Sequence, residues 1–77
     1  MNVYPNPFAD KLNIEITTPT TEQTEIKVID VLGKVQYMQT ITTNTTTELN
    51  TQLPAGVYML STTIDGKTKV MRVVKTN

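Results

Sequence analysis

Apolar and polar residues alternate with a period of two along most of the chain, and this alternation predicts β-strands. In the clearest segment, Leu12, Ile14 and Ile16 alternate with polar residues, and Pro19 ends the run. Sixteen threonines and only two alanines favour the same structure, because β-branched side chains lose little freedom on a pleated backbone. No segment has the pattern of a helix of useful length, so the sequence predicts an all-β fold.

The middle of the chain predicts two longer strands and a polar loop. Residues 25–31 carry apolar side chains at both even-numbered and odd-numbered positions. This pattern predicts a central strand that contacts protein on both faces near its end. Gly33 is expected to close that strand in a turn, and residues 34–41 form the next strand. Residues 42–52 are mostly threonine and asparagine, which predicts a surface loop followed by a short edge strand.

The last third of the chain predicts a hairpin. Residues 57–64 form a strand that ends at Asp65-Gly66, a dipeptide suited to a two-residue turn in which both residues have positive φ. Residues 67–75 return as its partner. With a short opening strand around Val3 and Tyr4, the chain has about seven strands, and we expect one domain over 1–77 with the fold of a small immunoglobulin-like antiparallel β-sandwich.

The composition argues against a catalytic or nucleic-acid-binding function. The chain of 77 residues has a thin core, because a domain of this size buries only about 60% of the surface that its unfolded chain exposes. Histidine and cysteine are absent, which removes disulfides, thiol nucleophiles, thiolate metal sites and an imidazole base. Seven basic and seven acidic side chains cancel, so no overall field attracts nucleic acid. We therefore expect no enzyme activity, no cofactor and no nucleic-acid partner.

The carboxylates give no clear catalytic or metal site. They lie mostly beside predicted turns, where solvated acids are common, and no run of acids spaced by one residue resembles a calcium loop. No catalytic residue and no metal ligand is predicted. No apolar run approaches the length of about 20 residues needed to cross a bilayer, and the N-terminus lacks a basic segment followed by an apolar one.

Four short segments stand out: YPNPF at 4–8, DVLGKV at 30–35, LPAGVYML at 53–60 and KVMRVVK at 69–75. Each has a structural explanation. The prolines of the first segment fix φ and hold Tyr4 and Asn6 extended, so that Phe8 reaches the core. Gly33 and Gly56 are expected to be turn glycines, Gly33 with a positive φ.

Tyr58 follows Leu53 and a proline at a spacing that resembles the tyrosine corner of immunoglobulin-like sandwiches. We expect the Tyr58 hydroxyl to bond to backbone in the turn at 53–55. The ring is then committed to the core and to the turn before its own strand.

Together, in this order and over about residues 3–75, the four segments resemble the C-terminal sorting domain, type A, of cargo proteins exported by the type IX secretion system of Bacteroidetes. The resemblance implies a single sorting domain excised from a larger secreted protein, which directs a fused cargo across the outer membrane. The motif residues that carry the resemblance are Tyr4, Pro5, Asn6, Pro7, Phe8, Asp30, Gly33, Lys34, Leu53, Gly56, Val57 and Tyr58.

The resemblance also implies partners and a route. The partners are the outer-membrane translocon, the shuttle protein and the sortase of the type IX system, together with an upstream cargo domain in the parent chain. The domain then passes through the periplasm to the cell surface or the extracellular space. A weak homodimer through edge strands is a further expectation.

The terminal strand has two interpretations. Its lysines suit an edge strand protected against aggregation. The resemblance instead implies that this strand is recognised by the translocation machinery, and a partner strand adding to its edge is one way to do so. The recognition residues implied are Lys69, Val70, Met71, Arg72, Val73, Val74 and Lys75.

Two other classes of function stay open at this point. One is a carbohydrate-binding or adhesive immunoglobulin-like module of an extracellular enzyme. Such a site needs exposed aromatic faces, and Tyr4 and Tyr37 alone make a poor platform if Phe8 and Tyr58 lie in the core. The other is a structural spacer, for which the terminal strand has no special role.

Overall fold

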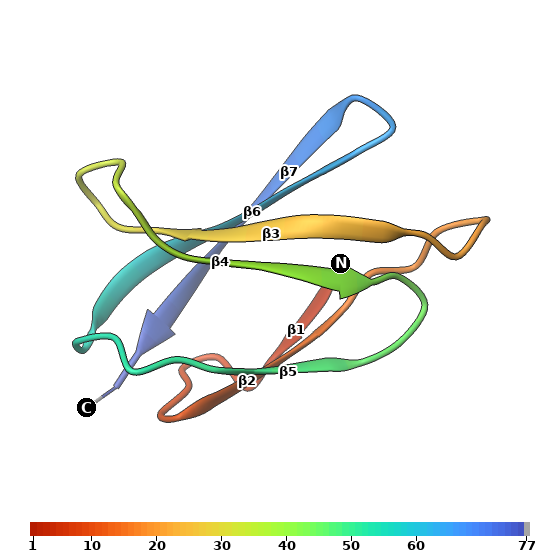
Figure 1. Ribbon diagram of the computed structural model, residues 1–77. Coiled ribbons are helices and arrows are strands. Elements are labelled where there is room, and N and C mark those ends of the chain that lie inside the picture. The colour runs from red at the N-terminus through yellow and green to blue at the C-terminus, as the bar shows by residue number, and fades with distance from the viewer. Residues whose placement is uncertain (77) are drawn as a thin grey trace.

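The computed structural model describes residues 1–76, which form two antiparallel sheets and no helix (Figure 1). One sheet has three strands in the order β1-β2-β5, and the other has four in the order β4-β3-β6-β7. The strands are β1 (Asn2–Tyr4), β2 (Lys11–Glu15), β3 (Gln23–Ile29), β4 (Val35–Thr42), β5 (Thr47–Asn50), β6 (Gly56–Ile64) and β7 (Lys67–Lys75). The predicted all-β sandwich with seven strands is confirmed.

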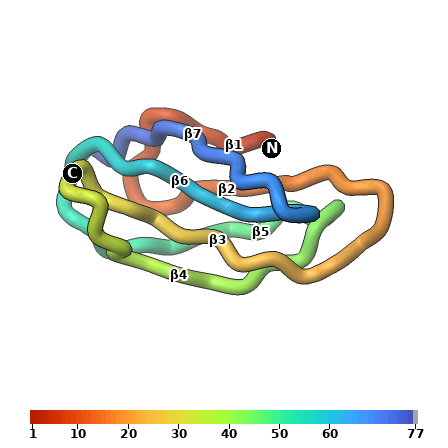
Figure 2. The backbone as a smooth tube through the Cα atoms, turned by 90° about the horizontal axis from the view of Figure 1, so that it is seen from above, coloured from red at the N-terminus to blue at the C-terminus, as the bar shows by residue number. Residues whose placement is uncertain are grey.

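The core lies between the two sheets and is built from the alternating residues of both. Figure 2 looks onto the four-stranded sheet and shows its strands side by side in the order β4, β3, β6, β7. Leu12, Ile14 and Ile16 are buried, as their alternation predicts. The buried hydrophobic residues are Phe8, Leu12, Ile14, Ile16, Ile26, Val28, Ile41, Leu49, Tyr58, Leu60 and Val73.

β3 lies between β4 and β6, as expected for a central strand. The expectation that it contacts protein on both sides near its end is wrong. β3 ends at Ile29, and Val31 lies in the following turn with 75% of its surface exposed. Ile26 and Val28 face the core, whereas Ile29 alternates onto the opposite, outer face of the sheet. The apolar residues on both parities therefore mark an apolar outer face and not a second packed layer.

Three of the predicted turn conformations are present and one is not. Gly33 has a φ of +85°, and Asp65 and Gly66 have φ values of +52° and +75°, as the two-residue hairpin turn requires. Gly56 is not a turn glycine. It is the first residue of β6, is paired with Lys75 and has no positive φ.

The threonine-rich segment after β4 is tied to the β2–β3 connection. The Thr43 N–H donates to the Glu22 carbonyl at 2.8 Å, and the Thr43 hydroxyl oxygen accepts from the Glu22 N–H at 2.9 Å. The Asn44 N–H donates to the Ile16 carbonyl at 2.7 Å. The prediction of a surface loop is wrong at Thr43, which is fully buried, because its hydroxyl accepts hydrogen bonds from the Glu22 N–H and the Thr18 hydroxyl.

Tyr58 makes the corner that its sequence context predicts. Its ring is 6% exposed and its hydroxyl donates to the Pro54 carbonyl at 2.6 Å. The bond joins β6 to the turn that precedes it, and the hypothesis of a tyrosine corner is confirmed.

Replacing Tyr58 by Phe leaves the Pro54 carbonyl without this donor and is expected to cost about 1 kcal/mol of unfolding free energy. Chemical denaturation of both variants measures the difference. Tyr37→Phe is the matched control: its hydroxyl donates to the side chain of Gln39, which is half-buried and accessible to water. An equal or larger loss in the control contradicts a special role for the Tyr58 hydroxyl.

Candidate functional site

The first and last segments of the chain meet at the outer edge of β7. The Asn6 side-chain N–H donates to the Arg72 carbonyl at 3.1 Å, and the Val74 N–H donates to the Asn6 side-chain oxygen at 3.0 Å. One side-chain amide therefore satisfies a backbone acceptor and a backbone donor on the strand edge, as a neighbouring strand would.

Phe8 continues this contact with its own backbone. It forms a parallel bridge to Lys75, in which the Phe8 N–H donates to the Val74 carbonyl at 2.9 Å and the Thr76 N–H donates to the Phe8 carbonyl at 2.8 Å. The Phe8 ring is 2% exposed, as predicted, and the Lys75 Nζ lies 6.0 Å from its centroid. We call residues Asn6 to Phe8 the N-terminal clip.

The clip divides the edge of β7 into two halves. β7 is the last strand of its sheet, and its even-numbered residues direct their backbone groups away from β6. The clip pairs with this edge from Arg72 to Thr76. Within residues 1–76, the outward backbone groups of Thr68 and Val70 have no backbone partner. The edge is therefore open only near the hairpin tip, which extends beyond the other strands in Figure 1.

The residues predicted for recognition face in different directions. Val73 and Lys75 are buried, at 0% and 4% exposed. Val70, at 54%, and Arg72 lie on the outer face of the sheet. Lys69 is exposed on the other face, and Met71 and Val74 are half-buried. A folded domain thus presents only part of the segment 69–75 to a partner.

The β3–β4 turn is organised by Asp30. Its carboxylate accepts from the N–H groups of Leu32 and Lys34, both at 2.9 Å, and from the Gln36 side chain at 2.7 Å. The hydrogen bond from the Lys34 N–H, followed by that from Gln36, holds the pKa of Asp30 below its ordinary value of 3.8. The DVLGK motif therefore specifies a rigid turn, while Leu32 at its tip is 89% exposed.

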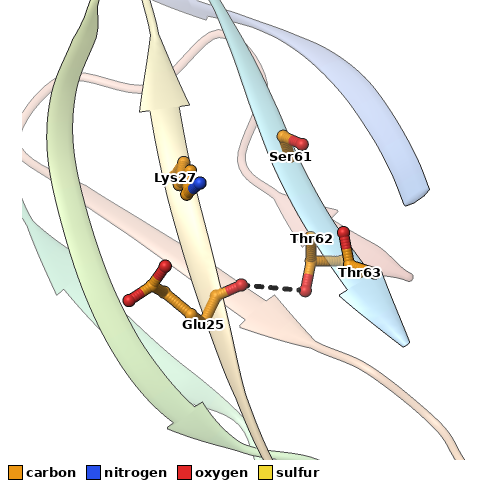
Figure 3. Close-up of a pocket in the computed structure, with 5 residues that line it drawn as sticks. All are labelled: Glu25, Lys27, Ser61, Thr62 and Thr63. Carbon is orange, nitrogen blue, oxygen red and sulfur yellow. Dashed lines mark hydrogen bonds between the residues drawn. The ribbon is translucent and has the colours of Figure 1, made fainter. Parts of the chain in front are cut away.

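A shallow polar pocket of about 290 Å³ lies on the outer face between β3 and β6 (Figure 3). Glu25, Lys27, Ser61 and Thr63 line it together with Thr62, whose hydroxyl donates to the Glu25 carbonyl at 3.1 Å. No sequence pattern predicts this pocket, because its sides come from two strands that are far apart along the chain.

The described part of the chain has few features suited to chemistry. Among residues 1–76, no three histidine, cysteine, aspartate or glutamate side chains gather in a way that fits a metal ion. The salt bridge in this part joins exposed Lys11 and Glu48 at 3.7 Å. None of the described segments is a helix long and apolar enough to span a membrane. What the fold does assemble is a β-sandwich module with a clipped terminal strand and an exposed sheet face.

The chain belongs to the family described as the secretion system C-terminal sorting domain, whose family model matches residues 2–76. The resemblance of the four sequence segments is therefore confirmed. Members of this family are the C-terminal sorting signals of type IX secretion, which leads to the cell surface or the extracellular space. Neither the curated proteins nor the solved structures include a significant match to this chain.

Asn6→Ala removes both side-chain hydrogen bonds of the clip and is expected to cost about 1 kcal/mol of unfolding free energy, since one donor and one acceptor on the edge of β7 lose their partners. The Val74 amide is expected to exchange with solvent faster. Denaturation and amide hydrogen exchange measure the two effects. The control is Asn50→Ala, at an exposed side chain without a hydrogen bond in the described residues. Unchanged exchange at Val74 contradicts the clip.

Asp30→Asn tests the turn. A pKa lowered in the folded state means that the carboxylate stabilises the fold above its unfolded pKa, and that this contribution disappears as the pH falls through the folded pKa. The melting temperature of wild type is therefore expected to exceed that of Asp30→Asn at neutral pH, by a margin that shrinks below about pH 4.

The matched control for the turn is Asp10→Asn, which changes an exposed aspartate without a hydrogen bond in the described residues. Thermal unfolding across the pH range compares the three proteins. If the difference in melting temperature between wild type and Asp30→Asn stays constant with pH, the charge of the Asp30 carboxylate does not have the proposed role.

Proposed function

We propose that this chain directs a fused cargo protein across the outer membrane as a folded address, without catalysis of its own. In this proposal residues 1–77 are one domain of a larger secreted protein, and the cargo precedes them. The match to the sorting-domain family over residues 2–76 carries the proposal. The clip supports the view that the signal acts while folded, because the YPNPF and KVMRVVK segments form one surface only in the folded sandwich.

The partners in this proposal are the outer-membrane translocon, the shuttle protein and the sortase of the type IX system. The domain meets the translocon from the periplasm and ends at the cell surface or outside the cell. Lys69, Val70 and Arg72 are the residues of the terminal strand that a partner contacts, since their side chains are exposed. Val73 and Lys75 act by holding β7 in the sandwich.

Addition of a partner strand is restricted by the clip. It is confined to the open half of the edge, at Thr68 and Val70, because Asn6 and Phe8 occupy the other half. The same restriction leaves a second copy of this chain only a short edge for a homodimer through β7.

The carbohydrate-binding alternative has little support in the positions of the aromatic residues. Phe8 and Tyr58 are buried, and Tyr37 packs against the core. Tyr4, at 44% exposed, lies in the other sheet, so that no pair of rings forms a platform on one face.

A transfer experiment tests the proposal. Residues 3–77 are fused behind a fluorescent protein that carries an inner-membrane signal, and the fusion is expressed in a Bacteroidetes host with a type IX system. We expect fluorescence at the surface or in the medium, and its loss when residues 69–77 are deleted. Retention of a stably folded fusion in the periplasm contradicts the proposed function.

A second variant separates recognition from folding, since the deletion also removes most of β7. The triple variant Lys69→Ser, Val70→Ser and Arg72→Ser changes exposed side chains and keeps Val73 and Lys75 in the core. Loss of secretion with a retained thermal transition is the expected result. Normal secretion of this variant shows that the secretion machinery does not recognise these side chains.

A further inference from the structure

The outer face of the four-stranded sheet is half polar and half apolar. A sheet face in contact with water usually carries polar side chains at alternate positions. The half around the pocket of Figure 3 mostly follows this rule, with Glu25, Lys27, Ser61 and Thr63. Its exceptions are Met38, paired with Lys27, and Val70, paired with Ser61, each 54% exposed. The half next to the β3–β4 turn does not. We call its residues the apolar outer patch: Ile29, Val35, Val57, Met59 and Val74.

The strand register places these side chains next to one another. Ile29 is paired with Val35 on one side and with Met59 on the other. Val57 is paired with Val74 at the same end of the sheet. The patch therefore crosses all four strands and is continuous over the sheet.

The patch is separate from the core. Its residues alternate with the core residues of their strands, and none of them belongs to the set packed between the two sheets. Val35 is 43% exposed and the others are partly exposed. Val31 and Leu32, at 75% and 89% exposed, extend the apolar surface at the adjoining turn. A contiguous apolar area of this kind on a small domain indicates a contact surface.

Arg72 gives the patch its charge. It is paired with Met59 and lies on the same outer face as Val74. Its carbonyl is held by Asn6, so its backbone is fixed. No carboxylate of residues 1–76 lies within 4.0 Å of its guanidinium group, and its side chain donates no hydrogen bond there. An exposed arginine beside an apolar surface is suited to a carboxylate on a partner.

We infer that the apolar outer patch together with Arg72 is the docking surface for a component of the type IX machinery, whose matching surface carries aliphatic side chains around a carboxylate. The inference rests on the proposed function and deepens it. The sorting signal is then read from four strands at once, and the terminal strand supplies only one side of the surface.

Charge complementarity favours such a partner over a second copy of this chain. A two-fold dimer places the same patch on both sides, and the patch contains a cation and no acid. Asp30 follows the patch residue Ile29 in the sequence. Its carboxylate already accepts three hydrogen bonds within the β3–β4 turn. A partner with its own carboxylate satisfies Arg72, whereas a second copy does not.

The test compares Met59→Glu with Thr63→Glu in the secreted fluorescent fusion. Both positions lie on the outer face of β6, one in the patch and one in the polar half, and both variants add the same charge. We expect Met59→Glu to reduce secretion about tenfold or more, because position 59 is paired with Arg72, so the new carboxylate takes the guanidinium group from the partner's carboxylate and adds charge to the apolar contact. Thr63→Glu is expected to be secreted like wild type. Val35 lies in the patch on β4, the edge strand at the other end of the sheet from β7. Val35→Glu is expected to reduce secretion as Met59→Glu does.

The outcomes separate the two levels of the proposal. If the wild-type fusion is not secreted, the proposed function and this inference both fail. If wild type, Met59→Glu and Val35→Glu are secreted alike while the terminal-strand variant is not, the inference fails and the proposed function stands. Thermal melting of each purified domain shows whether a variant still folds.

Photo-crosslinking in the host covers the case in which Met59→Glu and Val35→Glu unfold the domain. Met59→benzoylphenylalanine in the fusion is expected to crosslink to an outer-membrane component of the machinery, and Thr63→benzoylphenylalanine is not. A crosslink from position 59 to a second copy of the fusion overturns the inference in favour of a dimer. No crosslink at position 59, or equal crosslinks at both positions, also overturns it.

Discussion

The hydrogen bonds between the N-terminal clip and the outer edge of β7 are the contact on which the arrangement of this domain depends. They join residues that are 66 and 68 positions apart, and they place Phe8 in the core between the sheets. They also cover edge groups that otherwise attract another strand. The start of the sorting domain and its terminal strand are therefore one structural unit.

This contact gives β7 distinct roles along its length. Val73 and Lys75 fill the interior, the backbone from Arg72 to Thr76 holds the clip, and the outer face carries Val70 and Arg72. A sorting signal built in this way is a surface and not a linear peptide. The same short segment serves stability and recognition, because alternate side chains of a strand face opposite sides.

Threonine makes so small a sandwich possible with few large apolar residues. The buried hydroxyl of Thr24 lies 3.2 Å from that of Thr62 and donates to the Thr63 carbonyl, and Thr62 donates to the Glu25 carbonyl. The Thr43 hydroxyl instead accepts from the Glu22 N–H, while the Thr43 N–H donates to the Glu22 carbonyl. Threonine thus favours strands because it is β-branched. Its hydroxyl also forms hydrogen bonds with backbone groups that a thin core does not fully shield from water.

The sequence by itself determined the strands, the turns at Gly33 and Asp65-Gly66, the burial of Phe8 and Tyr58, and the family. These features depend on local backbone preferences and on side-chain alternation, both of which are determined by residues adjacent in the sequence. Of the candidate site, the sequence predicted the terminal strand but not which of its side chains are exposed.

Only the tertiary structure decided the partners of Asn6, the strand beginning at Gly56 and the apolar outer face at Ile29. Alternation separates the two faces of a strand but does not say which face meets the other sheet. Nor does it say which distant segment covers an edge, because pairing is fixed by packing between residues far apart in the chain.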